Sequence, residues 1–315
     1  MTKTATTLTD GSGLVVVDKP GGWTSHQVVG RVRRLLGTRK VGHAGTLDPM
    51  ATGVLLVGVN RATRLLGHLA GHDKSYEATI TLGASTVSDD AEGDLVEWLG
   101  AAGVSEADVR TAVTAFTGVI SQVPSAVSAI KVNGKRAYAR VRAGEQVDLK
   151  PRQVTVSRFE VTGVRASASF GWIDGSATNA PLLNVDVVVD CSSGTYIRAL
   201  ARDLGRVLGC GGHLSALRRT RVGGFDLSQV GLDADGLAGD AAPQLLDLAD
   251  VARRAFDVVE VSADAAREIG FGRALELSVP ADPTALIRDG ELLALYRPGP
   301  DGRAHPVAVL APASC

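Results

Sequence analysis

The sequence predicts an α+β protein with a mixed sheet and a second, smaller β-rich domain. Helix-like and strand-like segments follow one another without the strict strand–helix–strand order of a doubly wound fold. The 315 residues, 45% of them hydrophobic, suffice for one large domain or two unequal ones. Residues 255–315 carry short strand-like runs between glycine- and proline-rich turns. We therefore expect a main domain, a linker region and a small C-terminal domain over 13–230, 231–250 and 251–315.

The N-terminal part of the chain alternates between strands and helices. Residues 1–12 are polar, and we expect them to be disordered. Thr24 or Ser25 can cap a helix that runs to Leu36, because valines recur at helical spacing within it. Strands are predicted where apolar residues form continuous or alternating runs, at 14–17, 54–59 and 76–82, with a short helix at 61–69.

The central part of the chain contains further elements. After an acidic loop at 89–93, Ser105 begins a helix with one apolar face. Residues 121–150 predict an arm, because an Asn133-Gly134 hairpin turn precedes a basic helix over 135–142. The remaining predictions are strands at 153–163 and 183–190 and a helix at 196–208.

Charge is distributed unevenly along the chain. Residues 1–230 contain 26 Lys and Arg against 20 Asp and Glu, a net charge of +6, whereas residues 231–315 contain 7 against 14, a net charge of −7. Basic clusters at 31–40, 131–142 and 218–221 lie in the positive part and favour contact with phosphates. We therefore expect any anionic partner on the first 230 residues.

The segment 42–53 interrupts the apolar pattern with three glycines, one proline and two threonines, and we interpret it as a shaped loop. Its centre holds one carboxylate, Asp48, between Leu47 and Pro49. Pro49 fixes its own φ and keeps Asp48 out of the helical region. Such a loop can hold a single acid against a ligand. The alternative is an ordinary turn in which Asp48 accepts local backbone hydrogen bonds.

Two further side chains are candidates for a site. Aromatic residues make up only 4% of the chain, and Tyr76 stands at a strand start beside Lys74. It is either a platform on which a base stacks, worth ~1–3 kcal/mol per base, or a core tyrosine. Arg198 and Arg202 are four residues apart on a predicted helix and share a face. They either hold a carboxylate or form a solvated surface.

Several kinds of site have no support in the sequence. His68 and His72 have helical spacing without a third ligand at metal-like spacing. No phosphate-binding loop or dinucleotide fingerprint follows a strand. The three cysteines are odd in number and lack CxxC spacing, which fits a reducing cytoplasm. No apolar run reaches the roughly 18 residues of a membrane span. We therefore expect cytoplasmic, cofactor-free and metal-free chemistry centred on one carboxylate.

The segment 42–53 resembles the catalytic motif of the bacterial tRNA pseudouridine synthases of the TruB family. Further motifs resemble those of the family in the same order, with DKPGGWTS at 18–25, KSYE at 74–77, QVP at 122–124 with GKRAY at 134–138, SGTYIR at 193–198 and HLSALRRT at 213–220. The resemblance covers residues 14–222. It implies the pseudouridine synthase fold, a mainly antiparallel sheet with flanking helices, an inserted arm at 121–150 that grips tRNA, and a PUA-like C-terminal domain.

The resemblance also implies a reaction and a site. These enzymes isomerise the position-55 uridine in the T loop of tRNA to pseudouridine, without a cofactor. Asp48 corresponds to the catalytic aspartate. The substrate would be bound by Tyr76 stacking on the target base, Arg198 pairing with Asp48, Tyr196 and Leu217 lining the base pocket, and His43 holding the flipped loop. Phosphate contacts are expected from Lys19, Arg39, Lys131 and Arg136. Taken alone, His43 is equally a buried, satisfied histidine.

Two features depart from the family pattern. The family often has two prolines after the glutamine, whereas Pro124 is followed here by Ser125. The C-terminal region carries −7, and an acidic surface repels phosphates. These departures put in question the local turn and the role of the C-terminal domain in tRNA contact.

The resemblance leaves the mechanism and the mode of action open. Three first steps are open: Asp48 attacks C1′, Asp48 attacks the base, or Asp48 removes the C2′ proton. Tyr76 is a candidate for removing the proton from C5. We expect the T arm of tRNA as partner, with no membrane and no obligatory protein partner, and a monomeric enzyme. The alternatives are a guide-RNA-dependent pseudouridine synthase, an RNA chaperone, and a carboxylate-dependent hydrolase. The motifs contain no paired second acid, which argues against the hydrolase.

Overall fold

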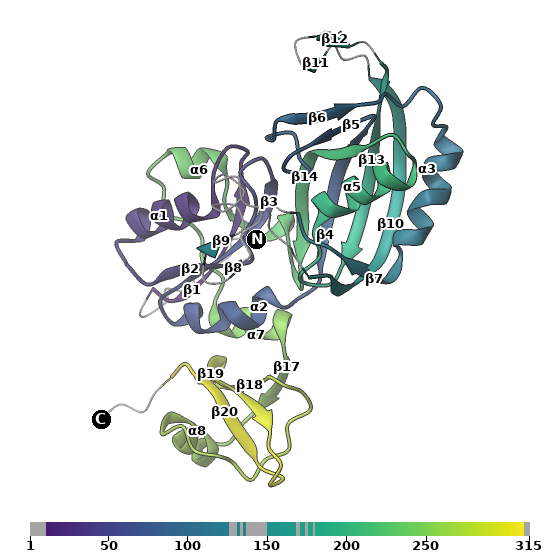
Figure 1. The fold of residues 1–315 in the computed structure, drawn as a ribbon. Coiled ribbons are helices and arrows are strands. Elements are labelled where there is room, and N and C mark those ends of the chain that lie inside the picture. The colour runs from purple at the N-terminus through teal and green to yellow at the C-terminus, as the bar shows by residue number, and fades with distance from the viewer. Residues whose placement is uncertain are drawn as a thin grey trace. The chain divides into compact units, whose positions relative to one another are not determined.

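The computed structural model describes residues 11–125, 131–132, 135–136, 150–167, 171–173, 176–178 and 180–311. They divide between two compact units (Figure 1). The first unit joins the N-terminal part of the chain, Met1–His72, to the C-terminal part, Arg221–Cys315. The second unit is the continuous segment Asp73–Thr220. The candidate site residues are divided between the two units.

The first unit contains three strands around β1 (Gly13–Lys19). It pairs antiparallel with β3 (Thr52–Val59) and parallel with β16 (Val230–Leu232). On the far side of β3 lies β2 (Val41–Ala44), which pairs antiparallel with it. The strands are buried because their residues are almost all apolar, which predicts a sheet covered on both faces.

Helix α1 (Ser25–Leu36) begins and ends with ordinary capping chemistry. The Thr24 hydroxyl accepts a hydrogen bond from the Gln27 amide at 3.2 Å, and the Gln27 side chain accepts one from the Thr24 amide at 2.7 Å. Gly37 ends the helix in the left-handed region, at φ +63°. Thr24 is therefore the cap, and Ser25 is available for another role.

The remaining elements of the first unit follow in two groups. After β3 come η1 (Asn60–Leu65) and α2 (Leu66–Ala70), and after the second unit come β15 (Phe225–Asp226), η3 (Leu227–Gln229), α6 (Ala234–Ala238) and α7 (Leu248–Ala255). The C-terminal group adds α8 (Ala263–Gly270) and a four-stranded sheet in the order β17 (Asp257–Glu260), β18 (Thr284–Arg288), β19 (Glu291–Pro298) and β20 (Ala304–Val309). This sheet is the small β-rich domain that the sequence predicts.

The second unit is built on a five-stranded run of sheet. Its strand order is β14 (Gly212–Val222), β4 (Lys74–Leu82), β13 (Leu182–Cys191), β10 (Arg152–Ser167) and β7 (Gly118–Gln122). β4 with β13, β13 with β10, and β10 with β7 are all antiparallel. Short hairpins pair β5 (Ala84–Thr86) with β6 (Leu95–Trp98), β8 (Lys131–Val132) with β9 (Lys135–Arg136), and β11 (Gly171–Ile173) with β12 (Ser176–Thr178).

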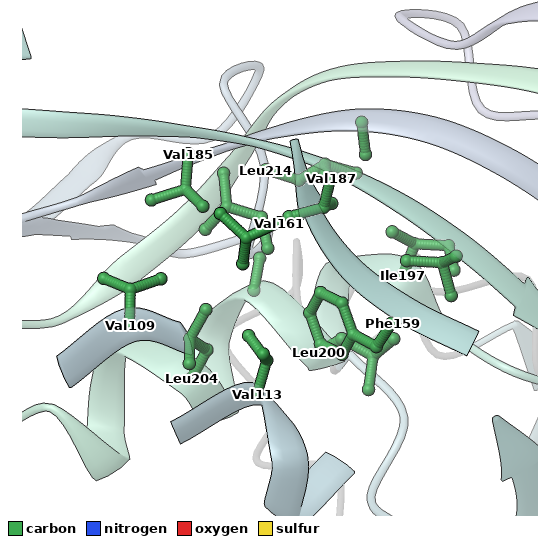
Figure 2. Packing of buried hydrophobic residues seen from close by; sticks show 14 of the residues in the cluster. Val109, Val113, Phe159, Val161, Val185, Val187, Ile197, Leu200, Leu204 and Leu214 are labelled. Atoms are coloured by element: carbon green, nitrogen blue, oxygen red, sulfur yellow. The ribbon is translucent and has the colours of Figure 1, made fainter. Parts of the chain in front are cut away.

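Two helices bury their apolar faces against this sheet. They are α3 (Glu106–Val113), which is followed by η2 (Thr114–Phe116), and α5 (Ile197–Val207). Figure 2 shows Val113 of α3 and Leu204 of α5 pointing toward Val161 and Val185 of the strands. Since α5 is fixed to the sheet by its apolar face, the arginines on its other side hold defined positions.

The predicted fold class, α+β with a mixed, mainly antiparallel sheet, is confirmed. Three local predictions are wrong. The predicted loop at 42–53 begins later, because residues up to Ala44 pair with β3 as β2. The predicted helix at 135–142 does not begin at 135, because Lys135 and Arg136 pair with β8. The predicted linker at 231–250 contains α6 and the start of α7. The rest of the predicted arm helix lies outside the described residues.

One further finding concerns membranes. Among the residues that the structure describes, no helix combines the length and the apolar character needed to cross a bilayer.

Candidate active site

Asp48 lies on the loop between β2 and β3 in the first unit, where it is half-buried. The backbone turns at this point, because the Asp48 carbonyl oxygen accepts a hydrogen bond of 3.1 Å from the Ala51 amide. Gly45 has a φ of +84°, a region that side chains with a Cβ rarely enter, so the loop leaves β2 at a glycine for a steric reason. The carboxylate thus has partial access to solvent on a structured turn.

Ser25 holds the residue that precedes Asp48. Its hydroxyl accepts a hydrogen bond from the Leu47 amide at 3.0 Å and donates one to the Leu47 carbonyl oxygen at 3.1 Å. Ser25 is 1% exposed and Leu47 is 3% exposed. Because one buried hydroxyl satisfies both polar groups of this residue, the position of the loop is fixed by the first turn of α1.

Lys19 holds the residue that follows Asp48. Its ammonium group is fully buried and donates hydrogen bonds to the carbonyl oxygens of Pro20 at 2.9 Å, Trp23 at 2.7 Å and Pro49 at 3.1 Å. The Gly22 amide donates a second hydrogen bond to Pro49, at 2.9 Å. The ammonium is buried here, and the predicted contact of Lys19 with phosphates stays a prediction. Its role is to join the 18–25 motif to the Asp48 loop.

His43 lies on β2 opposite Val57 of β3 and is half-buried. Its ring packs edge-to-face against the exposed His26 of α1, with 5.5 Å between ring centroids. The histidine therefore stands on a paired strand two residues before the glycine turn. This placement fixes its backbone relative to the Asp48 loop.

Tyr76 lies on β4 in the second unit, directly opposite Val189 of β13. It is 6% exposed and belongs to the core cluster of this unit. Leu217 on β14 is half-buried and packs against the same cluster. The alternative interpretation of Tyr76 as a core tyrosine thus describes its surroundings, and stacking on a base stays a prediction.

Lys74, two residues before Tyr76 on β4, is a buried cation. Burial lowers the pKa of its ammonium group to about 8, and the positive charge of Arg219 adds to this effect. Across the strand pair lies Cys191, whose thiol pKa is raised by burial to about 11. This edge of the sheet therefore carries less positive charge at alkaline pH than its sequence indicates.

Arg198 is buried near the start of α5 and pairs with a carboxylate of its own unit. Its guanidinium lies 3.2 Å from Asp90 and donates a hydrogen bond of 3.0 Å to the Ser88 carbonyl oxygen. The side chains of Arg198 and Asp90 are 8% and 4% exposed. The interpretation of this arginine as a solvated surface residue is therefore wrong.

Arg202, one turn further along α5, pairs with the preceding acid. Its guanidinium lies 3.1 Å from Asp89 and 3.0 Å from Asp203, and it donates to the Val123 carbonyl oxygen at 2.8 Å. The Ser125 hydroxyl donates to the same Asp89 oxygen at 2.6 Å. The two arginines therefore do hold carboxylates, one each from the acidic loop.

Tyr196 occupies the N-cap position of α5 without a side-chain cap. The amide side chain of Gln122 replaces it, because it accepts a hydrogen bond from the Tyr196 amide at 2.8 Å and donates one to the Tyr196 carbonyl oxygen at 3.0 Å. Gln122 is 2% exposed. The QVP motif thus sets the starting point of the helix that carries Arg198.

The basic residues differ in their accessibility. Arg39 is exposed after α1, as a phosphate contact requires. Arg31, from the same cluster, is instead directed to the Leu237 carbonyl oxygen at 2.9 Å and to Asp240 at 3.1 Å. The side chains of Lys131 and Arg136 lie outside the described residues, so their predicted contacts stay predictions.

The predicted site residues fall into two groups. The first unit carries Asp48 and His43, and the second carries Tyr76, Tyr196, Arg198 and Leu217. The predicted pairing of Asp48 with Arg198 stays a prediction.

Sequence reasoning missed three contributors. Asp90 was not assigned as the partner of Arg198, Ser25 was considered only as a cap, and Gln122 only as part of a motif. Two adjacent acids in a glycine-containing loop, together with two arginines at helical spacing, are the sequence signal for the Asp90 pairing. The signal identifies neither the partner of each arginine nor the loop it meets.

Comparison with known proteins shows close relatives over the whole chain. Residues 33–197 match the TruB family pseudouridylate synthase (N terminal domain), and residues 198–234 match the tRNA pseudouridylate synthase B C-terminal domain. The chain is 58% identical over 303 residues to tRNA pseudouridine synthase B of Cutibacterium acnes, covering 95% of this chain and 98% of that protein. It is 54% identical over 313 residues to tRNA pseudouridine synthase B of Arthrobacter sp., covering 96% and 98%.

Solved structures with the same fold include chains from two complexes. A chain from an H/ACA ribonucleoprotein bound to a substrate RNA containing 2′-deoxyuridine has a TM-score of 0.66 and 23% identity, covering 95% of this chain and 85% of that chain. A chain from a Cbf5-Nop10-Gar1 complex has a TM-score of 0.66 and 25% identity, with the same coverage.

Proposed function

This chain belongs to the TruB family of pseudouridylate synthases, and on that premise we propose that Asp48 is its catalytic carboxylate. The enzyme is a tRNA pseudouridine synthase, an isomerase that converts the position-55 uridine in the T loop of tRNA. The observation that carries the assignment of Asp48 is its loop. A half-buried carboxylate stands between two residues whose backbones are bonded by the buried side chains of Ser25 and Lys19.

The reaction is an isomerisation, so the atoms of substrate and product are the same. The N1–C1′ bond of the uridine breaks, the uracil turns, C5 bonds to C1′, the proton leaves C5, and N1 takes up a proton. No oxidant or reductant takes part. The target base must leave its stack before C1′ is accessible, and this costs a few kcal/mol. A carboxylate that needs no reorganisation on binding lowers the barrier of the chemical step.

The other predicted residues have roles that fit their places. Tyr76 stacks on the base, Tyr196 and Leu217 line its pocket, and His43 stabilises the flipped nucleotide. Arg198 orients the Asp48 carboxylate. The buried ion pair of Arg198 with Asp90 supports this role, because Asp90 balances the charge of the guanidinium and fixes its orientation.

The test of the catalytic assignment is the Asp48→Asn variant. We expect it to bind a tRNA T-arm hairpin as the wild type does and to release no tritium from C5-labelled uridine. Asp18→Asn, an acid in the neighbouring motif, serves as the comparison for charge removal near the loop. Turnover of Asp48→Asn near the wild-type rate would reject Asp48 as the catalytic group.

We propose that the enzyme acts as a monomer, without a protein partner, in the cytoplasm. The TruB relatives match it over nearly their full length, whereas the Cbf5-Nop10-Gar1 neighbour is a complex at lower identity. Purified protein should therefore modify an unmodified tRNA, and the bare T-arm hairpin, with chemical mapping placing pseudouridine at position 55. A requirement for added proteins or a guide RNA would favour the complex-dependent alternative.

A further inference from the structure

We propose that Asp89, Arg202 and Ser125 form a positioning triad that keeps the Arg198–Asp90 pair in its working geometry. This inference rests on the proposed role of Arg198 as the residue that orients the catalytic carboxylate. It assigns Arg202 to this task and not to contact with RNA. All five residues belong to the second unit.

The first step of the argument is the pairing pattern. Two adjacent acids meet two arginines that lie one turn apart on α5, with Arg198 to Asp90 at 3.2 Å and Arg202 to Asp89 at 3.1 Å. In a low-dielectric setting, neighbouring carboxylates repel each other, and each arginine is attracted to both. The observed arrangement is stable only while both arginines are present. Without Arg202, Asp89 becomes a second acceptor that competes with Asp90 for Arg198.

The second step is the conformation of the acidic loop. Asp89 has a φ of +60°, in the left-handed region that Asp tolerates better than most side chains with a Cβ. Backbone hydrogen bonds hold the loop against β14, because the Leu214 amide donates to Asp89 at 3.0 Å and the Ala91 amide donates to Leu214 at 3.0 Å. The loop backbone is thus held by β14 as well as by Arg198, and substitution of the side chain at 89 by Asn keeps this conformation accessible.

The third step is the burial and saturation of the triad. Ser125 is fully buried, and its hydroxyl and the Arg202 guanidinium bond the same Asp89 oxygen, at 2.6 and 3.1 Å. Arg202 also bonds Val123 and Asp203. Each of its three guanidinium nitrogens thus has a protein acceptor, which leaves little capacity for a phosphate.

The fourth step links the triad to the segment before the arm. Residues 122–125 contact the Arg198 helix at three points: Gln122 bonds the Tyr196 backbone, the Val123 carbonyl oxygen accepts from Arg202, and Ser125 is linked to Arg202 through Asp89. Burial raises the pKa of the Asp89 carboxyl, while Ser125 and Arg202 oppose this effect. The positive charge of Arg198 opposes it as well, so Ser125 and both arginines favour the charged carboxylate.

The test uses three variants and one matched control. Arg202→Met and Asp89→Asn each remove one charge, and the double variant removes both. Arg206→Met is the control, because Arg206 is the next arginine on the same helix face and its side chain is 79% exposed. For each protein, T-arm affinity and the single-turnover rate at saturating enzyme are measured, with thermal unfolding to show that the chain folds.

We expect Arg202→Met to lower the single-turnover rate at least about tenfold, equivalent to ~1.4 kcal/mol, with T-arm affinity within about twofold of the wild type. The double variant should recover most of this loss, because Asp89→Asn removes the competing charge. A double variant that is faster than Arg202→Met alone would show that Asp89 and Arg202 interact. Ser125→Ala should lower the rate less, and Arg206→Met should leave it unchanged.

Two outcomes overturn the proposal. An Arg202→Met variant that binds the T arm more weakly but turns over normally at saturation would make Arg202 a phosphate contact. Equal rates in all variants would make the triad irrelevant to catalysis. If the wild type itself does not convert the T arm, the proposed function fails separately. In that case the thermal stabilities of the same single and double variants test the triad. Stability changes that simply add would reject it.

Discussion

The ammonium group of Lys19 donates a hydrogen bond of 3.1 Å to the carbonyl oxygen of Pro49, the residue directly after Asp48. Two motifs that are separated by a whole helix in the sequence are therefore one structural piece. Because the ammonium also bonds Pro20 and Trp23, the loop that follows β1 and the Asp48 loop cannot move independently.

Replacing Lys19 by Met should lower both stability and activity. The side chain keeps its approximate length but leaves three carbonyl oxygens without this donor, and an unsatisfied buried acceptor costs ~1–3 kcal/mol. Urea unfolding should show a loss of at least that size, and tritium release should fall. Arg267→Met, at an exposed arginine of α8, is the comparison and should change neither. A Lys19→Met protein with wild-type stability would contradict the structural role.

The Ser25→Ala variant tests the contact with the Asp48 loop separately from the N-cap of α1. The substitution removes the hydroxyl that bonds both backbone groups of Leu47, so we expect a loss of ~1–3 kcal/mol and lower turnover. Thr24→Ala is the matched comparison, because it removes the N-cap at a cost of ~1 kcal/mol without touching the loop. Both variants should unfold at lower urea concentration, but only Ser25→Ala should turn over more slowly. Equal activities would show that Ser25 matters for folding alone.

Tyr76→Phe keeps the ring and removes the hydroxyl. If the hydroxyl takes the C5 proton, turnover should fall by at least about 100-fold, the usual contribution of general acid–base catalysis, while T-arm affinity is preserved. Tyr76→Leu should lose affinity as well, because stacking is lost. Wild-type turnover in the Phe variant would reject a proton-transfer role and leave Tyr76 as a stacking or core residue.

Lys74 should make the stability of the wild type depend on alkaline pH. Burial and Arg219 lower its folded-state pKa from 10.5 to about 8, whereas the nearby Cys191 and Asp73 oppose the shift. Between pH 8 and 10.5 the unfolded chain therefore binds more protons, so the free energy of unfolding rises with pH, by at most about 3 kcal/mol.

The Lys74→Met variant should lack this rise, which chemical unfolding at pH 7.5, 9 and 10 would measure. The difference between the two proteins isolates Lys74 from other groups that titrate in the same range. Parallel curves for both proteins would show that the lysine is not perturbed.

Predictions from the sequence succeeded where short-range pattern decides the outcome. The apolar runs of β1, β3 and β13 and the capped start of α1 were predicted close to their observed bounds, because such elements depend on the burial of their own residues. The sequence does not predict a strand at 41–44, because His43 and Ala44 lie between two glycines and show no alternation of apolar and polar residues. It is extended because β3 supplies its hydrogen-bond partners.

The sequence by itself determined the family, the position of the single candidate acid at Asp48, and the presence of a basic main domain with an acidic C-terminal region. These follow from residue types and their order along the chain. Only the tertiary structure decided that Lys19 is a buried support of the Asp48 loop, and that Arg198 and Arg202 each hold one acid of the 89–90 pair. Burial and ion pairing depend on which distant segments meet, and that is set by the packing of whole strands and helices.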